Sequence, residues 1–187
     1  MRTRLLILLT VVIAALTGSA VPASADGASV QTLFTETPYW FQNNATGLCM
    51  DSPSTGAPGA NAPVTQYHCR WGDIDNQVWK IRATRVVNGV GLYQIYNNKG
   101  GYCLDVPARG AQPAGALVST NFCTWPPQDD NQEWHFDGDA SINHFLVINY
   151  KSGLCLDVSG AGGSGGPDAR LTLYYCSIID DHVWHIW

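Results

Sequence analysis

The sequence predicts an all-β protein in which one structural unit occurs three times and closes into a threefold arrangement. Pro and Gly are scattered along the chain, and no long amphipathic helical pattern occurs. Aromatic and β-branched residues fill short runs that alternate with period 2, as in half-buried strands. In addition, one motif recurs as "GLCMDS" at 47–52, "GYCLDV" at 101–106 and "GLCLDV" at 153–158.

The recurring motif belongs to a longer repeat of about 50 residues. Six residues before the cysteine, each copy has an asparagine, at Asn43, Asn97 and Asn149. Downstream, the copies read "VTQYHC", "VSTNFC" and "LTLYYC", followed by "DNQVWKI", "DNQEWHF" and "DDHVWHI". Because a β-propeller needs about four to eight blades, three copies favour a closed threefold β structure instead.

The N-terminus has the features of a secretory signal peptide. Arg2 and Arg4 precede an apolar run at 5–16, and the small residues "ASA" at 23–25 precede Asp26. This run is shorter than the roughly 20 residues that span a bilayer, and no later apolar run approaches that length. We therefore expect a signal peptide and an exported protein without membrane insertion. The expected divisions are the signal peptide at 1–25, a leader at 26–37 and one domain at 38–187, with repeats at about 38–84, 92–138 and 144–187.

Removal of the signal peptide leaves a modestly acidic chain. The full sequence has ten Lys and Arg residues and fifteen Asp and Glu residues, and the signal peptide contains two of the basic ones, Arg2 and Arg4. The remaining basic residues do not cluster, whereas nucleic-acid binding needs clustered Lys and Arg. We therefore expect no nucleic-acid partner.

Six cysteines in an exported chain predict disulfides, and no C-x-x-C pair suggests zinc or thioredoxin chemistry. Within each copy, the two cysteines are 20 or 21 residues apart. This spacing favours pairing inside each repeat, and closing a loop of that size contributes about 3 kcal/mol to stability. The expected pairs are Cys49 with Cys69, Cys103 with Cys123, and Cys155 with Cys176.

The aspartate of each motif is a candidate ligand-binding group. On a period-2 strand, Cys49 and Asp51 share one face, while Met50 faces the other way. With Met50 packed inward, we expect Asp51 at the surface, where the strand gives way to a loop. The same reasoning applies to Asp105 and Asp157. A carboxylate can accept hydrogen bonds from two donors, and adjacent sugar hydroxyls supply two, so the repeated aspartates indicate sugar binding.

The triplicated G-x-C-[LM]-D motif, the second cysteine and the closing Q-x-W together resemble a ricin B-type lectin domain. The resemblance covers 38–187, and a motif present three times is far more specific than a single occurrence. It implies a β-trefoil fold and a secreted carbohydrate-binding protein that is not an enzyme. By the same resemblance, we expect galactose-containing glycans or xylan-like polysaccharides as partners. The third copy departs from the pattern, because His182 stands in place of the glutamine.

The resemblance also implies which residues contact the sugar. Two residues before the second cysteine, the family commonly has an aromatic residue that stacks on the sugar; Tyr67 and Tyr174 retain it, whereas Asn121 does not. Just before the closing tryptophan, the family has an asparagine that binds hydroxyls and an accompanying glutamine. The corresponding pairs are Asn76 with Gln77, Asn131 with Gln132, and Asp181 with His182. We therefore expect the first site to be the most complete, the third less so and the second least.

The other aromatic residues have different expected roles. Each closing tryptophan is followed two residues later by Ile or Phe, which predicts core positions for Trp79, Trp134 and Trp184. Phe122 follows the stacking position, so strand alternation predicts that it faces the core. Trp71 and Trp125 lie two residues past the second cysteine, where they either extend the sites or are isolated loop residues.

Two alternatives to a lectin remain. A β-trefoil can block another protein, as some protease inhibitors do, but this needs one loop, such as 53–63, rather than a repeated site. A small glycoside hydrolase needs a pair of carboxylates on one bond, whereas the repeated aspartates belong to separate units. "GGSGG" at 162–166 lies in a glycine-rich loop and lacks the strand and helix of a hydrolase nucleophile. The five histidines show no metal-ligand spacing, so we expect no metal or cofactor, and we expect a monomer.

Overall fold

The computed structural model describes residues 34, 36–72, 76–127, 130–160 and 162–187. The expected signal peptide at 1–25 and most of the expected leader at 26–37 lie outside the described residues. In the part of the chain that is described, no helix is long and apolar enough to cross a membrane.

The described residues form fourteen β-strands of one sheet and no α-helix. The first repeat contains β1 (Pro38–Tyr39), β2 (Phe41–Asn43), β3 (Cys49–Asp51), β4 (Ala62–Pro63), β5 (Thr65–Tyr67) and β6 (Trp79–Val87). The second contains β7 (Val90–Asn97), β8 (Cys103–Asp105), β9 (Ser119–Asn121) and β10 (Trp134–Asp139). The third contains β11 (His144–Asn149), β12 (Leu154–Val158), β13 (Leu171–Tyr174) and β14 (Val183–Ile186).

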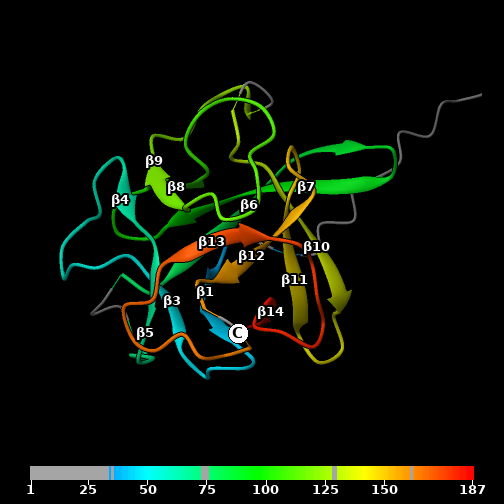
Figure 1. Ribbon diagram of the computed structural model, residues 1–187. Coiled ribbons are helices and arrows are strands. Elements are labelled where there is room, and N and C mark those ends of the chain that lie inside the picture. The colour runs from blue at the N-terminus through cyan, green and yellow to red at the C-terminus, as the bar shows by residue number, and fades with distance from the viewer. Residues whose placement is uncertain (1–33, 35, 73–75, 128–129, 161) are drawn as a thin grey trace, which may run out of the picture.

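The three repeats share one antiparallel pairing scheme. In each, the motif strand pairs with the strand that leads to the second cysteine: β3 with β5, β8 with β9, and β12 with β13. The strand that begins near the closing tryptophan pairs with the first strand of the next unit, β6 with β7 and β10 with β11. The C-terminal strand β14 returns to pair with β2 and so closes the circle (Figure 1). This arrangement confirms the predicted all-β, threefold β-trefoil.

The closing tryptophans form the centre of the core, as predicted. Trp79, Trp134 and Trp184 are fully buried. Each indole Nε1 donates a hydrogen bond of 3.1 Å to a backbone carbonyl of the motif, at Met50, Leu104 and Leu156 respectively. The side chains of those three residues are also fully buried, so they face inward as expected. The indole hydrogen bonds thus satisfy polar backbone groups inside an apolar core.

The recurring asparagine connects each repeat to the one before it. Asn97 Oδ1 accepts hydrogen bonds from two backbone N–H groups of the turn before the motif. Its Nδ2 donates at 3.0 Å to the carbonyl of Asn76, at the end of the preceding repeat. The other copies make the same link, from Asn43 to Asp181 and from Asn149 to Asn131. One side chain therefore joins a turn to a neighbouring repeat, which explains why the sequence repeats it.

Three disulfides pair the cysteines within repeats, as the spacing predicted: Cys49–Cys69, Cys103–Cys123 and Cys155–Cys176. Each joins the motif strand to a position two residues past the end of its partner strand. The chain between the two cysteines is therefore a closed loop, and this loop contains the variable glycine- and proline-rich segment of the repeat.

Candidate functional site

Each motif aspartate ends or nearly ends its strand and lies opposite a residue with a hydroxyl group. The pairs are Asp51 with Thr65, Asp105 with Ser119, and Asp157 with Thr172. The aspartates were predicted to lie at the surface, and this prediction was wrong: their exposed fractions are 6%, 2% and 6%, respectively.

Segments of a neighbouring repeat pair with the strands that lie opposite the aspartates. Leu117 in the second repeat forms a β-bridge with Thr172 in the third, and Thr65 in the first forms one with Arg170 in the third. Likewise, β4 of the first repeat pairs with β9 of the second. The aspartates thus lie between two repeats rather than on open strand ends. These contacts join segments far apart in the sequence, so strand alternation alone could not predict them.

One cleft lies in the third repeat, and we call it the third-repeat cleft. It has a volume of about 510 Å³ and brings Asp157 and Tyr174 together, with Tyr174 48% exposed. Asp180 and Leu117 also line it, and neither was predicted. Asp180 could have been found from the sequence, because it is next to the predicted Asp181. Leu117 could not, because it belongs to the second repeat and no local pattern places it in this cleft.

A smaller cleft of about 260 Å³, the first-repeat cleft, brings Asp51 and Tyr67 together. Arg70 and Asp168 line it as well. The Arg70 guanidinium lies 5.4 Å from the centre of the Tyr67 ring, which is within cation–π range. Neither residue was predicted. Arg70 directly follows the second cysteine and could have been noticed there, whereas Asp168 comes from the third repeat.

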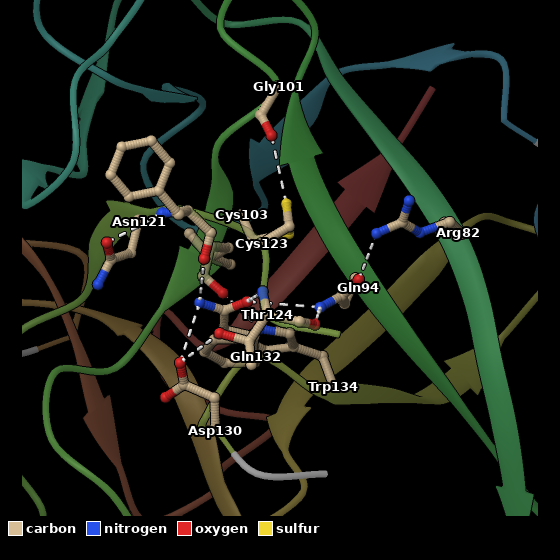
Figure 2. Close-up of a disulfide and its surroundings, with 12 residues drawn as sticks. Arg82, Gln94, Gly101, Cys103, Asn121, Cys123, Thr124, Asp130, Gln132 and Trp134 are labelled. Atoms are coloured by element: carbon tan, nitrogen blue, oxygen red, sulfur yellow. Dashed lines mark hydrogen bonds between the residues drawn. A yellow bond between two sulfur atoms is a disulfide. The ribbon is translucent and has the colours of Figure 1, made fainter. Parts of the chain in front are cut away.

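The second repeat has a hydrogen bond where the other two have an aromatic ring. Asn121 belongs to the group of residues around the Cys103–Cys123 disulfide (Figure 2). Its Nδ2 donates to Asp105 Oδ2 at 3.3 Å. Burial raises the pKa of Asp105 to about 6, although the hydrogen bond from Asn121 opposes this effect. In this repeat, therefore, the side chain of Asn121 already bonds to one oxygen of the Asp105 carboxylate.

The asparagines before the closing tryptophan are buried and hold loops in place. Asn76 Nδ2 donates to the carbonyls of Ser52 at 3.1 Å and Ser54 at 2.6 Å. Ser54 lines the first-repeat cleft, so Asn76 fixes one wall of that cleft. Asn131 makes the equivalent bonds in the second repeat, to the carbonyls of Val106 and Ala108.

The accompanying glutamines hold the chain just past the second cysteine. Gln132 Oε1 accepts the N–H of Thr124 at 2.9 Å (Figure 2). Gln77 Oε1 accepts the N–H of Arg70 at 2.7 Å in the same way. We expected Asn76, Gln77 and Asn131 to contact sugar hydroxyls directly. Their placement differs from that expectation, because these side chains have no exposed surface and donate to backbone carbonyls.

His182 takes the place of the glutamine in the third repeat. Its Nδ1 accepts the backbone N–H of Ser177 at 3.0 Å, as the glutamine oxygens accept in the other repeats. Because Nδ1 is an acceptor, the ring proton lies on Nε2, which donates to Asp157 Oδ1 at 2.9 Å. The hydroxyl of Thr172 donates to the other oxygen of Asp157. Both oxygens of this carboxylate are therefore oriented by the protein.

Asp181, which was expected to contact a sugar, is fully buried next to this pair. Burial raises its pKa to about 6, and Asp157 adds to the effect. Its Oδ2 accepts the N–H of Gly163 at 3.0 Å, which ties it to the glycine-rich loop. Among the described residues, Asp157, Asp181 and His182 form a cluster whose oxygen and nitrogen atoms lie within 4.8 Å of one another. Within this cluster, His182 Nε2 donates to Asp157, so these two members are joined by a hydrogen bond.

Phe122 does not face the core, and this prediction was wrong. Its side chain is 69% exposed and lies 5.1 Å from the Tyr102 ring. The reason is that β9 ends at Asn121, so the alternation of a strand no longer holds at the next residue. Trp71 and Trp125 are also more than half exposed.

Comparisons with known proteins agree with this architecture. The family model of the ricin-type beta-trefoil lectin domain matches residues 37–185. None of the curated protein sequences matches the chain.

Several solved structures share the fold. A designed 3-fold symmetric protein, ThreeFoil, has a TM-score of 0.65 and 23% identity, with 80% of this chain and 96% of that chain covered. A ricin B-like lectin from Macrolepiota procera, solved in complex with lactose, has a TM-score of 0.59 and 18% identity, with 81% and 95% covered. The C-half of an earthworm R-type lectin, solved in complex with GalNAc, has a TM-score of 0.56 and 12% identity, with 80% and 96% covered.

Proposed function

Since the chain belongs to the ricin-type beta-trefoil lectin family, we propose that it is an exported lectin that binds glycans through its first-repeat and third-repeat clefts. The observation that carries this proposal is the pairing of a carboxylate with an aromatic ring in each cleft, where Tyr174 is exposed and Tyr67 is partly exposed. Asp51 with Tyr67 and Asp157 with Tyr174 each line one cleft. The carboxylates accept bonds from two adjacent sugar hydroxyls, while the rings contact the apolar C–H face of the sugar.

The two clefts supply different additional contacts. In the first-repeat cleft, the Arg70 guanidinium adds donors for sugar oxygens beside the Tyr67 ring. In the third-repeat cleft, Asp180 adds a second acceptor and Leu117 an apolar contact. Each cleft offers a sugar one aromatic ring and a few polar groups. One sugar bound by a single ring and a few hydrogen bonds has an expected dissociation constant of about 1 mM, or about −4 kcal/mol.

The second repeat does not bind sugar in this proposal. Asn121 occupies the position of the stacking aromatic and already donates to Asp105. The missing ring distinguishes this repeat, because the Asp157 carboxylate of the third repeat also has hydrogen bonds within the protein. The protein therefore has two working sites on one rigid body. A polymer that presents the same sugar repeatedly can engage both, which raises the affinity about a hundredfold or more over a single site.

Galactose-containing glycans are the proposed ligands, with xylan-like polysaccharides as the second class. This choice draws on the two lectins with the same fold that were solved with lactose and GalNAc. The protein is proposed to act without catalysis. Asp157 is held at both oxygens by Thr172 and His182, and the buried Glu133 is ion-paired with Arg85, so neither is placed as a free acid or base. A protease-inhibitor role needs only one loop and leaves the repeated pairs of carboxylate and aromatic ring unexplained.

The test is glycan-array binding of the exported protein, followed by calorimetric titration with the short sugar that the array identifies. We expect a stoichiometry near two. Asp51→Ala and Asp157→Ala should each remove one site, and the matched variant Asp105→Ala should leave the stoichiometry unchanged. A stoichiometry of one, or a greater loss with Asp105→Ala than with Asp157→Ala, would contradict the assignment. Hydrolysis of the bound glycan would contradict the non-enzymatic role.

A further inference from the structure

Three tryptophans outside the two clefts meet where the N-terminal and C-terminal strands pair. Trp40 and Trp187 lie side by side and exchange backbone hydrogen bonds of 3.4 and 3.1 Å. The Trp71 ring lies 5.8 Å from the Trp40 ring and 6.1 Å from the Trp187 ring, inclined to them by 56° and 84°. The three indoles line a hollow of about 340 Å³. We call this group the tryptophan platform.

The fold does not require tryptophan at these positions, as the threefold symmetry shows. The strand pairs β6–β7, β10–β11 and β14–β2 share one register, in which Trp187 lies one residue beyond the pair Ile186 and Phe41. At the equivalent position, Arg82 lies opposite Gln94 in the first of these strand pairs. In the second, Asp137 lies opposite Leu146. The equivalent of Trp71 is Trp125 in the second repeat and Ile178 in the third. Arg82 of the first repeat bonds to Gln94 of the second (Figure 2) and lies 5.8 Å from the Trp125 ring. The trefoil therefore forms equally with charged and amide side chains at this place.

Two of the three indoles of the tryptophan platform are largely exposed to solvent. Trp71 and Trp187 are 56% and 52% exposed, and large apolar side chains gathered at a surface indicate a binding site. His185 stacks on Trp187, with ring centres 4.0 Å apart and planes inclined by 26°. The indole Nε1 of Trp187 donates to Gln42 Oε1 at 3.3 Å. These two contacts fix the Trp187 ring before any ligand arrives, which lowers the entropic cost of binding.

We propose that the tryptophan platform is a subsite for a polysaccharide chain that continues out of the first-repeat cleft. This inference rests on the proposed lectin function and specifies its ligand as a polymer rather than a single sugar. The connection is direct in the chain: Arg70 lines the first-repeat cleft, and the next residue, Trp71, lines the hollow. A sugar held beside Tyr67 and Arg70 can therefore extend toward Trp71.

The chemistry of the hollow selects the ligand class. Flat indole rings match the apolar C–H faces of successive pyranose rings, while the outer edges of those rings keep their hydroxyls in water. A stable protein partner uses about 20–30 residues on each side, far more than these three side chains offer. A second copy of the chain is the competing occupant, and it becomes one outcome of the test.

The experiment uses the exported protein and three probes: lactose, soluble galactan and soluble xylan. Affinity is measured by calorimetry for lactose and by affinity electrophoresis for the polymers. Trp71→Ala and Trp187→Ala should weaken binding of the tighter polymer about tenfold, since one stacking contact contributes roughly that factor. They should leave lactose affinity unchanged. Trp125→Ala, the symmetry-related variant, should change neither. Thermal unfolding checks that the variants remain folded, as their exposed positions predict.

The outcomes separate the platform from the lectin function. Unchanged polymer affinity in Trp71→Ala and Trp187→Ala, or absence of polymer binding by the unaltered protein, would overturn the platform. Persistent lactose binding in the double variant Asp51→Ala, Asp157→Ala would overturn the proposed clefts while leaving the platform to be judged on the polymer data. Sedimentation that showed a dimer lost in Trp71→Ala would also overturn it, because the platform would then be a contact between two copies.

Discussion

His182 Nε2 donates to Asp157 Oδ1 at 2.9 Å, and both side chains are almost fully buried behind the third-repeat cleft. The first repeat has Gln77 at the equivalent position, and an amide cannot change its charge. The carboxylate of the third-repeat cleft is therefore oriented by a group that titrates, whereas the first-repeat cleft is not. The two proposed sites should respond differently to pH.

We expect sugar binding in the third-repeat cleft to weaken as the pH falls. The pKa of His182 is raised above its ordinary value of 6.5: burial opposes the charged form, but the hydrogen bond to Asp157 and the charges of Asp157, Asp180 and Asp181 outweigh burial. The second proton goes to Nδ1, where it faces the N–H of Ser177 and breaks that bond. The chain that follows Ser177 carries Asp180, a wall of the cleft. Binding therefore weakens as the pH falls through a value above 6.5.

This loss of binding is not a loss of folding. Since the pKa is raised in the folded state, the contribution of His182 to stability is fully present below 6.5 and is lost only as the pH rises through the raised value. The measurement is calorimetry from about pH 5 to 8 in an Asp51→Ala background, which isolates the third-repeat cleft. Adding His182→Gln should remove the change above pH 6.5 and leave only the contribution of the neighbouring Asp181, whose pKa is about 6. A change above pH 6.5 that survives this substitution would show that another group is responsible.

Asp105→Asn should stabilise the protein at neutral pH. Burial raises the pKa of Asp105 from 3.8 to about 6, so its contribution to stability is present below 3.8 and is lost as the pH rises through about 6. The uncharged amide avoids this loss. We expect the melting temperature at pH 7 to rise by at least ~2 °C, with the difference from the unaltered protein vanishing near pH 4. A larger rise in melting temperature at pH 4 than at pH 7 would contradict the predicted direction of the pH dependence.

Trp79→Ala should destabilise the fold far more than Asp51→Ala. Trp79 is fully buried and bonds to the carbonyl of Met50, and truncation of a buried tryptophan costs about 3–5 kcal/mol. Asp51→Ala should leave the domain folded while removing one sugar site. Denaturant unfolding followed by tryptophan fluorescence compares the two. Similar losses of unfolding free energy in both variants would show that Asp51 is structural.

Asn76→Ala and Asn131→Ala form a matched pair. Each removes a buried amide that donates to two backbone carbonyls, and each should lower the free energy of unfolding by about 1–3 kcal/mol. Only Asn76 supports a proposed cleft, because its partner Ser54 lines it. Calorimetry should therefore show loss of the first-repeat site in Asn76→Ala and no change in Asn131→Ala. Equal effects on binding would contradict the positioning role.

The threefold architecture could be read from the sequence because it depends on patterns that repeat along the chain. Apolar residues at every second position, a cysteine at each end of a short loop and a tryptophan that closes each unit specify the strands, the disulfides and the core. These features involve residues within one repeat, where spacing along the chain reflects distance in space. The pairing of Cys49 with Cys69 and the burial of Trp79 followed from such local spacing.

Only the tertiary structure decided how deep the aspartates lie and what surrounds them. Leu117 reaches the third-repeat cleft and Asp168 the first-repeat cleft from another repeat, and Trp187 meets Trp40 through closure of the sheet. Asn76 is also fully buried, and its amide donates to the carbonyls of Ser52 and Ser54 instead of facing solvent. Sequence patterns report the faces of single strands, whereas a cleft between repeats depends on long-range packing. Local sequence patterns therefore determine the strands, whereas the packing of the three repeats against one another determines the clefts and the tryptophan platform.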